Sequence, residues 1–178
     1  MHPIKHFLTI TKHRHLVMHY CFKCGLYKQG LLHDLSKYGI TEFWNGAKYF
    51  LGTKSPHLAE RSDRGYSLAW MHHKGRNKHH MEYWIDMNVN TKEYEPVRVP
   101  KRYVYESICD RIAASKVYKK KEFTLRDPLD YFYYEGNSIP MHPDTRALLE
   151  SLLKYYADNG EKALFKYMKK NKNTKEYK

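Results

Sequence analysis

Residues 30–38 read GLLHDLSKY, an apolar run that ends at His33 and Asp34 and is followed three residues later by Lys37. A second stretch, WMHHKGRNKHHMEYW at residues 70–84, carries four of the twelve histidines of the chain between two tryptophans. Burying imidazole and carboxylate groups among apolar residues costs free energy unless a partner such as a metal ion satisfies them. Both stretches therefore predict a polar site inside a helical protein.

The rest of the chain has helical periodicity and no alternating segment long enough for a useful strand. Pro3, Pro100 and Pro143 suit the first turns of helices, whereas Gly25 and Gly160 suit positions where helices end. We expect helices over about 3–24, 26–37, 42–51 (capped by Thr41 and closed by Gly52), 63–74, 78–88, 101–120, 143–157 and 161–170, a loop at 53–62, an irregular link at 89–100 and turns at 124–143.

No internal repeat or linker divides the sequence, and 178 residues are enough to bury a sizeable core. The sequence predicts one all-α helical bundle over residues 1–178, with a basic, frayed tail at 166–178. Its net charge of +13 favours anionic partners, either small phosphorylated molecules or nucleic acid.

Two features of the sequence argue for a cytoplasmic protein without a membrane segment. The N-terminal region is interrupted by Lys5 and Lys12, so it resembles neither a signal peptide nor an anchor. Cys21, Cys24 and Cys109 lack the fourth ligand of a structural zinc site, and we expect buried free thiols in a reducing compartment.

Helical geometry separates the histidines of the first helix. At about 100° per residue, His6 and His13 share a stripe with apolar residues such as Val17, while His15 and His19 fall on the opposite, lysine-bearing side. We expect the first two to be buried and the last two to face water. By itself His6 reads as a buried hydrogen-bonding histidine, whereas His13 would need partners to act as a ligand.

Candidate partners lie on later helices. Asp110 shares an uncharged stripe with Ser107 and Ala114, whereas the charged positions Lys101, Glu106, Lys116 and Lys120 are expected elsewhere around the helix. A carboxylate on an uncharged face needs a cation, either a basic side chain or a metal. His73 continues an aromatic stripe with Trp70, and His80 is expected on the face of Trp84.

The ordered set of these residues resembles the HD-domain superfamily, whose members are all-α metal-dependent phosphohydrolases. The set is His13, His33, Asp34, His73, His79 or His80, and Asp110. The chain is more closely similar to a family of small bacterial HD-like proteins with the strings YKQGLLHDLSKY, HHKGRNKHHxEYW and CDRxAAS. These strings span about residues 10–118.

The resemblance implies one or two divalent ions of Mn, Fe, Co, Ni or Zn. His13, His33, Asp34 and Asp110 would hold the first ion, and Asp34 would bridge to a second one held by His73 and by His79 or His80. Asp34 and Lys37 would be catalytic, the latter by neutralising a phosphate oxygen. Lys37, Lys74, Arg76 and Lys78 would bind the substrate, although the last three also suit a solvated basic loop. We expect His6, Asn77 and Glu82 to orient the ligands.

The function expected from this resemblance is hydrolysis of a nucleotide or another small phosphoester by a metal-activated water. The same superfamily contains di-iron oxygenases, and the ligand set fits them equally well. A third alternative is a basic nucleic-acid-binding protein with a structural metal, which the charge and the seventeen tyrosines would suit.

Overall fold

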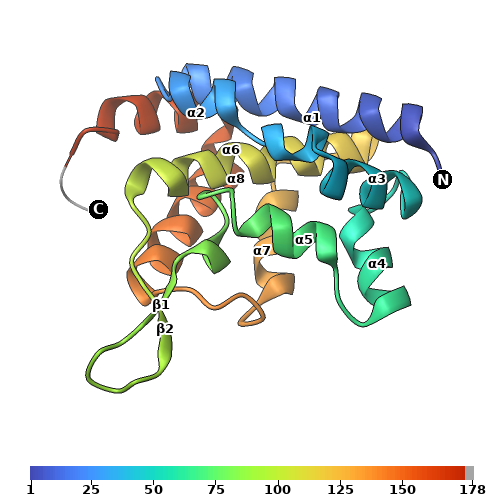
Figure 1. Cartoon of the computed structure of the whole chain (residues 1–178). Coiled ribbons are helices and arrows are strands. Elements are labelled where there is room, and N and C mark those ends of the chain that lie inside the picture. The colour runs from blue at the N-terminus through green and yellow to red at the C-terminus, as the bar shows by residue number, and fades with distance from the viewer. Residues whose placement is uncertain (175–178) are drawn as a thin grey trace.

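Helix α1 (Pro3–Lys23) lies along one side of the molecule, as Figure 1 shows. Pro3 begins the helix where no intrahelical donor is required. Gly25 follows the end of the helix with a φ of 73°, a left-handed conformation that glycine adopts readily. The computed structural model describes residues 1–174, and the first helix agrees with the prediction.

Seven further helices follow within residues 1–174. They are α2 (Tyr27–Leu32), α3 (Ile40–Lys48), α4 (Pro56–Arg64), α5 (Leu68–Lys74), α6 (Lys101–Lys119), α7 (Asp127–Glu135) and α8 (Pro143–Asn171), with short 3-10 turns η1 (Leu35–Tyr38), η2 (Met81–Tyr83) and η3 (Lys120–Glu122). Together they form one compact, predominantly α-helical domain, which confirms the predicted fold class.

The hydrophobic core lies between α1, α6, α7 and α8. Fully buried residues include Val17 on α1, Ile108 and Ile112 on α6, and Leu149 and Leu153 on α8. Burial of each such side chain stabilises the fold by about 1.5–3 kcal/mol. Helix α6 packs against α1 on one side and against α7 and α8 on others, so most of its residues are buried.

The predicted helix at 26–37 is wrong in its second half. Helix α2 ends at Leu32, where Arg14 of α1 donates hydrogen bonds to the carbonyl oxygens of Leu31 and His33. Asp34 then has a φ of 54°, a left-handed conformation that aspartate tolerates better than most residues. The His-Asp pair therefore lies between two short helices and is not carried by either.

Three other expected segments differ from the structure. Residues 53–62 contain most of α4, which begins at Pro56, and the turn-rich 124–143 contains α7. The predicted helix at 78–88 is instead η2 followed by β1 (Ile85–Met87), which pairs antiparallel with β2 (Tyr94–Pro96) from the predicted irregular link. There the indole of Trp84 donates to the carbonyl of Lys78, and its own carbonyl accepts from the amide of Val97 across the hairpin. Those contacts replace the helical hydrogen bonds.

Helix boundaries near the middle and the end of the chain differ less. Gly39 rather than Thr41 is the cap residue of α3. Helix α8 is interrupted at Gly160, whose φ of 78° and ψ of 180° are not helical, as predicted. Residues 166–171 are helical and Met168 is buried, so that part of the predicted frayed tail is wrong.

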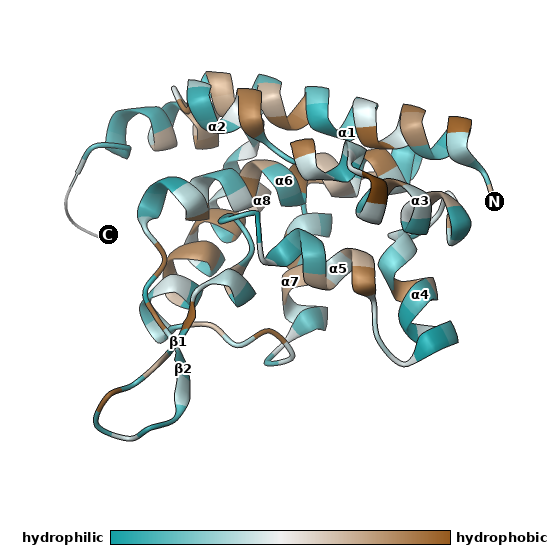
Figure 2. Cartoon of the chain, in the orientation of Figure 1, coloured by the Kyte–Doolittle hydropathy of each residue, from teal (hydrophilic) through white to brown (hydrophobic). Residues whose placement is uncertain are grey.

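Residues 175–178 of the predicted tail lie outside the described residues. Within the described part of the chain, the helices are too short or too polar to span a lipid bilayer. Figure 2 shows why for α4 and the second half of α5, whose residues are mainly hydrophilic.

Candidate metal centre

His33 and Asp34 lie at the centre of a cluster built from α1, the α2–η1 junction, α5, the segment after α5, and α6. Their side chains are only 0% and 1% exposed. On one side stand His13 of α1 and Asp110 of α6, and on the other stands His73 of α5. Residues that are far apart in sequence therefore surround the pair.

The first group of potential ligand atoms comprises His13, His33, Asp34 and Asp110. The Nε2 atom of His13 lies 2.9 Å from Oδ1 of Asp110 and 3.7 Å from Oδ2 of Asp34. The Nε2 atom of His33 lies 3.3 Å from the same oxygen of Asp34 and 3.6 Å from Oδ1 of Asp110. Ligands bound at about 2.1 Å lie about 3.0–3.4 Å apart in octahedral or tetrahedral geometry. The observed spacings bracket that range.

The second group uses the other oxygen of Asp34. Its Oδ1 atom lies 3.3 Å from Nε2 of His73 and 3.5 Å from Nε2 of His79. His80 supplies a further ligand atom within 4.8 Å of the others, so the structure places both His79 and His80 in this group. Asp34 thus presents one oxygen to each group, and Oδ2 of Asp110 lies 3.9 Å from Nε2 of His79.

The atoms that face one another in this cluster form no hydrogen bond of normal geometry, and their shortest polar contacts are an ion pair of Asp34 with Lys37 and the contact of His13 with Asp110. These atoms are Nε2 of His13, His33, His73, His79 and His80, and both carboxylate oxygens of Asp34. Buried polar groups in folded proteins are nearly always paired, and leaving one unpaired costs about 1–3 kcal/mol. Seven such atoms converging on one place are the arrangement that a bound cation would satisfy.

Two buried glutamates hold the opposite edges of these imidazole rings. Oε1 of Glu106 lies 2.9 Å from Nδ1 of His33 and 3.3 Å from Nδ1 of His79. Oε2 of Glu42 lies 2.7 Å from Nδ1 of His73. An imidazole that donates its Nδ1–H to a carboxylate keeps the Nε2 lone pair free for a metal.

Neither glutamate was among the residues expected at the site. Glu106 was expected elsewhere around the helix from Asp110, yet it is buried and is four residues from Asp110, which places the two within about 40° on a helical wheel. That spacing was the available signal, and the expected separation of the two residues is wrong. Lys101, which was also expected elsewhere around the helix, is buried as well. Glu42 carries no comparable signal, because only the packing of α3 against α5 brings it to His73.

The junction of α4 and α5 positions His73. Ser67 caps α5 by accepting a hydrogen bond from the amide of Trp70. The carboxylate of Glu60 accepts hydrogen bonds from the Ser67 hydroxyl and from the amides of Leu68 and Ala69, at 2.6, 3.1 and 3.4 Å. These contacts fix the start of α5, and His73 follows one and a half turns later.

The charges of the cluster shift the pKa values of its members. Burial would raise the pKa of Asp34, but the positive charges of His33, Lys37 and His73 hold it well below its usual range. Burial would likewise lower the pKa of His33, yet the carboxylates of Asp34, Asp110 and Glu106 raise it well above its usual value. Burial and then the neighbouring histidines lower the pKa of His80. The ionised carboxylates at the centre are therefore stabilised by the positive charges beside them.

Two of the other predicted residues lie at the cluster. Nζ of Lys37 is 2.6 Å from Oδ2 of Asp34. The side-chain amide of Asn77 donates to the hydroxyl of Ser36 at 2.9 Å and to the carbonyl of His73 at 2.8 Å. Asn77 therefore helps to hold the segment that carries His73.

The remaining predicted residues have other surroundings. His6 is buried against Phe43 and Phe50, away from the ligand groups. Arg76 donates to the carbonyl of His72 at 3.3 Å. Lys78 lies over the ring of Tyr83.

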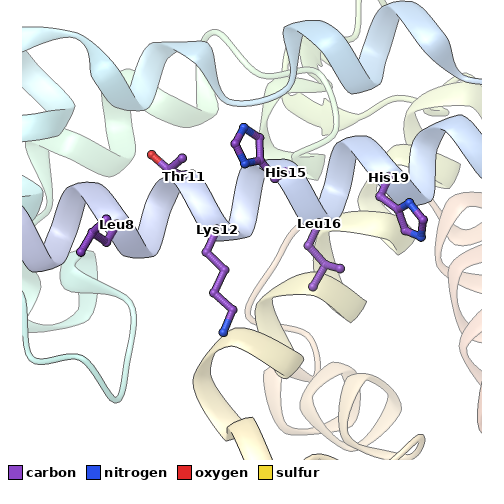
Figure 3. Close-up of a pocket in the computed structure, with 6 residues that line it drawn as sticks. All are labelled: Leu8, Thr11, Lys12, His15, Leu16 and His19. Carbon is purple, nitrogen blue, oxygen red and sulfur yellow. The ribbon is translucent and has the colours of Figure 1, made fainter.

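For Glu82 and Lys74, no contact with a ligand histidine is found among residues 1–174, and Glu42 and Glu106 fill the role expected of Glu82. His15 and His19 are exposed, as predicted. They line an open groove of about 550 Å³ on α1, together with Leu8, Thr11, Lys12 and Leu16 (Figure 3). This groove contains none of the seven predicted ligands.

Comparisons with known proteins identify a family to which the chain belongs. The sequence pattern of a family of unknown function (DUF5662) matches residues 2–155, which is most of the chain. No curated protein and no solved structure matches the chain.

Proposed function

We propose that this protein, which belongs to the family of unknown function DUF5662, is a metal-dependent phosphohydrolase that acts on a nucleotide or another small phosphoester. One observation carries the proposal: seven buried imidazole and carboxylate atoms converge on one place without hydrogen bonds of normal geometry between them. The resemblance to the HD-domain superfamily supplies the reaction class, and the donor set suits one or two ions of Mn, Fe, Co, Ni or Zn.

The side chains of the cluster have separate roles in this proposal. His13, His33, Asp34 and Asp110 would hold one ion, and Asp34 with His73, His79 and His80 would hold a second. A bound divalent ion lowers the pKa of its water toward neutrality and so supplies a nucleophile for phosphoester hydrolysis.

The other residues prepare the ligands and the substrate. Glu42 and Glu106 keep the ligating nitrogens of their histidines unprotonated by accepting Nδ1–H from the opposite edge of the ring. Lys37, which is paired with Asp34 and still 30% exposed, would neutralise a phosphate oxygen that reaches the centre.

Two rival functions are outcomes of the same experiments. The imidazole-rich donor set also suits a di-iron oxygenase, for which purified protein would contain iron and show an oxygen-dependent spectrum. A nucleic-acid-binding protein would show salt-sensitive binding that survives chelation. The order and convergence of the histidines and aspartates favour the phosphohydrolase and the oxygenase over this last alternative.

We also propose a cytoplasmic location. The three cysteines are free and buried, with the sulfur atoms of Cys24 and Cys109 4.0 Å apart. Such thiols are typical of proteins in reducing compartments.

Metal analysis of protein purified without added metal tests the central claim. His13→Ala should lose metal, because His13 supplies a buried ligand atom, while His15→Ala and His19→Ala on the exposed side of α1 should keep it. Equal metal loss in all three folded variants would contradict the assignment. Chelation should lower the melting temperature, because an ion that binds only the folded state stabilises it.

A screen of phosphoesters on the metal-loaded protein then separates the enzyme classes. Release of phosphate that depends on the metal and on Asp34 supports hydrolysis. A metal-loaded protein that hydrolyses none of the esters but consumes oxygen would contradict the phosphohydrolase and support the di-iron oxygenase.

A further inference from the structure

The exposed fractions of the side chains show from which side a substrate reaches the centre. Asp34 and His33 are buried, with 1% and 0% of their side chains exposed. Asp110 retains 17% and Lys37 retains 30%. A molecule in solvent therefore meets the cluster where Lys37 and Asp110 lie, and the groups around these two residues would contact it first.

The start of α4 supplies hydrogen-bonding groups on this side. His57 packs against Trp70 with ring centroids 4.6 Å apart, and Trp70 in turn packs 4.7 Å from the ring of His80. The hydroxyl of Ser55 lies 2.7 Å from Nδ1 of His57. A residue predicted to be in a loop thus belongs to the wall of the candidate centre.

This wall is rich in positive charge. Burial, followed by the charges of Arg61, Lys37 and His73, lowers the pKa of His57 to about 3. His57 is therefore neutral and has cationic groups near it. Burial raises the pKa of Tyr118 on α6, and the charge of Lys37 opposes that rise.

Arg61 differs from its neighbour Arg64 because its guanidinium has no carboxylate partner among residues 1–174. The guanidinium of Arg64 is 3.4 Å from a carboxylate oxygen of Glu60 and 3.0 Å from the hydroxyl of Tyr66. The guanidinium of Arg61 lies 5.7 Å over the ring of Trp70 and forms no ion pair with any carboxylate among residues 1–174. The aromatic ring holds this arginine beside a polar centre. Because it lacks an acidic partner, its guanidinium can pair with an anionic ligand.

We propose that Arg61, together with Lys37, binds the terminal phosphate of a phosphomonoester at this entrance, which rests on the proposed phosphohydrolase function. A monoester phosphate has three non-bridging oxygens, so one can enter the Asp34 centre while two remain for the two donors of a guanidinium. A phosphodiester has only two non-bridging oxygens, so one in the Asp34 centre leaves a single oxygen for the guanidinium. The geometry therefore selects monoesters, including the terminal phosphates of nucleotides.

The predicted substrate residues after α5 are less suited to this role. The guanidinium of Arg76 already donates to the carbonyl of His72, and the ammonium of Lys78 lies 5.5 Å over Tyr83. Lys78, like Arg61, lies over an aromatic ring, but its Tyr83 ring packs against Trp84, whereas the Trp70 ring under Arg61 packs against His73 and His80 of the candidate centre.

Calorimetric binding of inorganic phosphate and of phenyl phosphate to the full-length protein as purified tests the inference. Arg61→Gln should raise both dissociation constants about 10- to 100-fold, since a charge-assisted pair is lost. The dissociation constants of Arg61→Lys should lie between those of Arg61→Gln and the wild type, because lysine keeps the charge but not the two parallel donors of a guanidinium. Arg64→Gln, which removes the same charge from the same helix, should leave both constants unchanged.

Several results would overturn the inference. They are unchanged phosphate affinity in Arg61→Gln, equal losses in Arg61→Gln and Arg64→Gln, a loss confined to Arg76→Gln, or no binding of phosphate to the wild type. Dimethyl phosphate should bind weakly and with no dependence on Arg61, and equal dependence would contradict selection of monoesters. The metal content of the same samples reports on the proposed function separately, so its failure is distinguishable from a failure of Arg61.

Discussion

Asp34 and Glu60 are equally buried carboxylates, each 1% exposed, but their surroundings are opposite. Glu60 accepts hydrogen bonds from a hydroxyl and two backbone amides at the start of α5, and an arginine lies beside it. Both oxygens of Asp34 instead face imidazole nitrogens, and one of the oxygens also lies beside the ammonium of Lys37. A carboxylate satisfied by its own backbone neighbourhood stabilises a junction, whereas one facing lone pairs requires a cation.

The largest expected effect is that of Asp34→Asn. Asparagine tolerates the left-handed conformation at this position but cannot supply a charged oxygen to either ligand group. Metal-dependent phosphoester hydrolysis should fall about 1000-fold or more, because loss of the ion removes its activated water.

The melting temperature of metal-free Asp34→Asn should change far less than the activity, because the amide oxygen of asparagine can still accept a hydrogen bond from Lys37. Calorimetry and metal analysis of the folded variant measure both quantities. Unfolding without any metal-linked effect would make Asp34 a structural residue like Glu60 and remove the contrast.

Glu106→Gln should have the next largest effect. Glutamine keeps the shape of the side chain but no longer selects the Nδ1–H form of His33 and His79, so metal affinity should fall about 10- to 100-fold. Glu82→Gln is the matched control, since the sequence predicted the same role for it, and its metal affinity should equal that of the wild type. Competition with a chromogenic chelator measures the affinities, and equal losses in both variants would favour a general electrostatic effect.

Glu60→Gln should act on stability and not on the metal. It removes the charge from hydrogen bonds to Ser67, Leu68 and Ala69, and the free energy of unfolding should fall by about 1–3 kcal/mol. Urea denaturation measures this loss. The metal content of the folded variant should stay at the wild-type level, and metal loss comparable to that of Asp34→Asn would show that the two carboxylates do not differ as described.

The smallest effect is expected for His6, whose Nδ1 atom is also unpaired but lies among phenylalanine rings. Burial and then the charge of Lys37 lower the pKa of His6 to about 4. The unfolded chain, with a histidine pKa of about 6.5, therefore takes up this proton more readily. The contribution of His6 to stability is complete above about pH 6.5 and is lost as the pH falls toward about 4.

The melting temperature of His6→Gln should therefore fall less between pH 7 and pH 4.5 than that of the wild type. For His15→Gln, on the exposed side of α1, the fall should equal that of the wild type. Thermal denaturation monitored by circular dichroism at the two pH values checks the difference. Metal content should be unchanged in both variants, and loss of metal in His6→Gln would place His6 with the residues that orient the ligands.

Local pattern was sufficient for part of this site. The helical stripe of α1 predicted that His13 would be buried and His15 exposed, because every residue of a regular helix has a calculable direction. The same reasoning failed where the helix was not regular, as at His33 and Asp34. It was also wrong for Glu106, which was placed elsewhere around the helix from Asp110 although a spacing of four residues puts both on one side.

Helical periodicity and residue identity are local properties, so they were enough to predict an all-α fold and the chemical types of the side chains at the centre. The packing of distant helices was needed to bring both His79 and His80 close to Asp34, to set Glu42 and Glu106 against the histidine rings, and to hold Arg61 of α4 over Trp70 of α5. These arrangements depend on contacts between helices distant in sequence. The free energy of such contacts comes from packing the whole domain, and no short stretch of the chain encodes it.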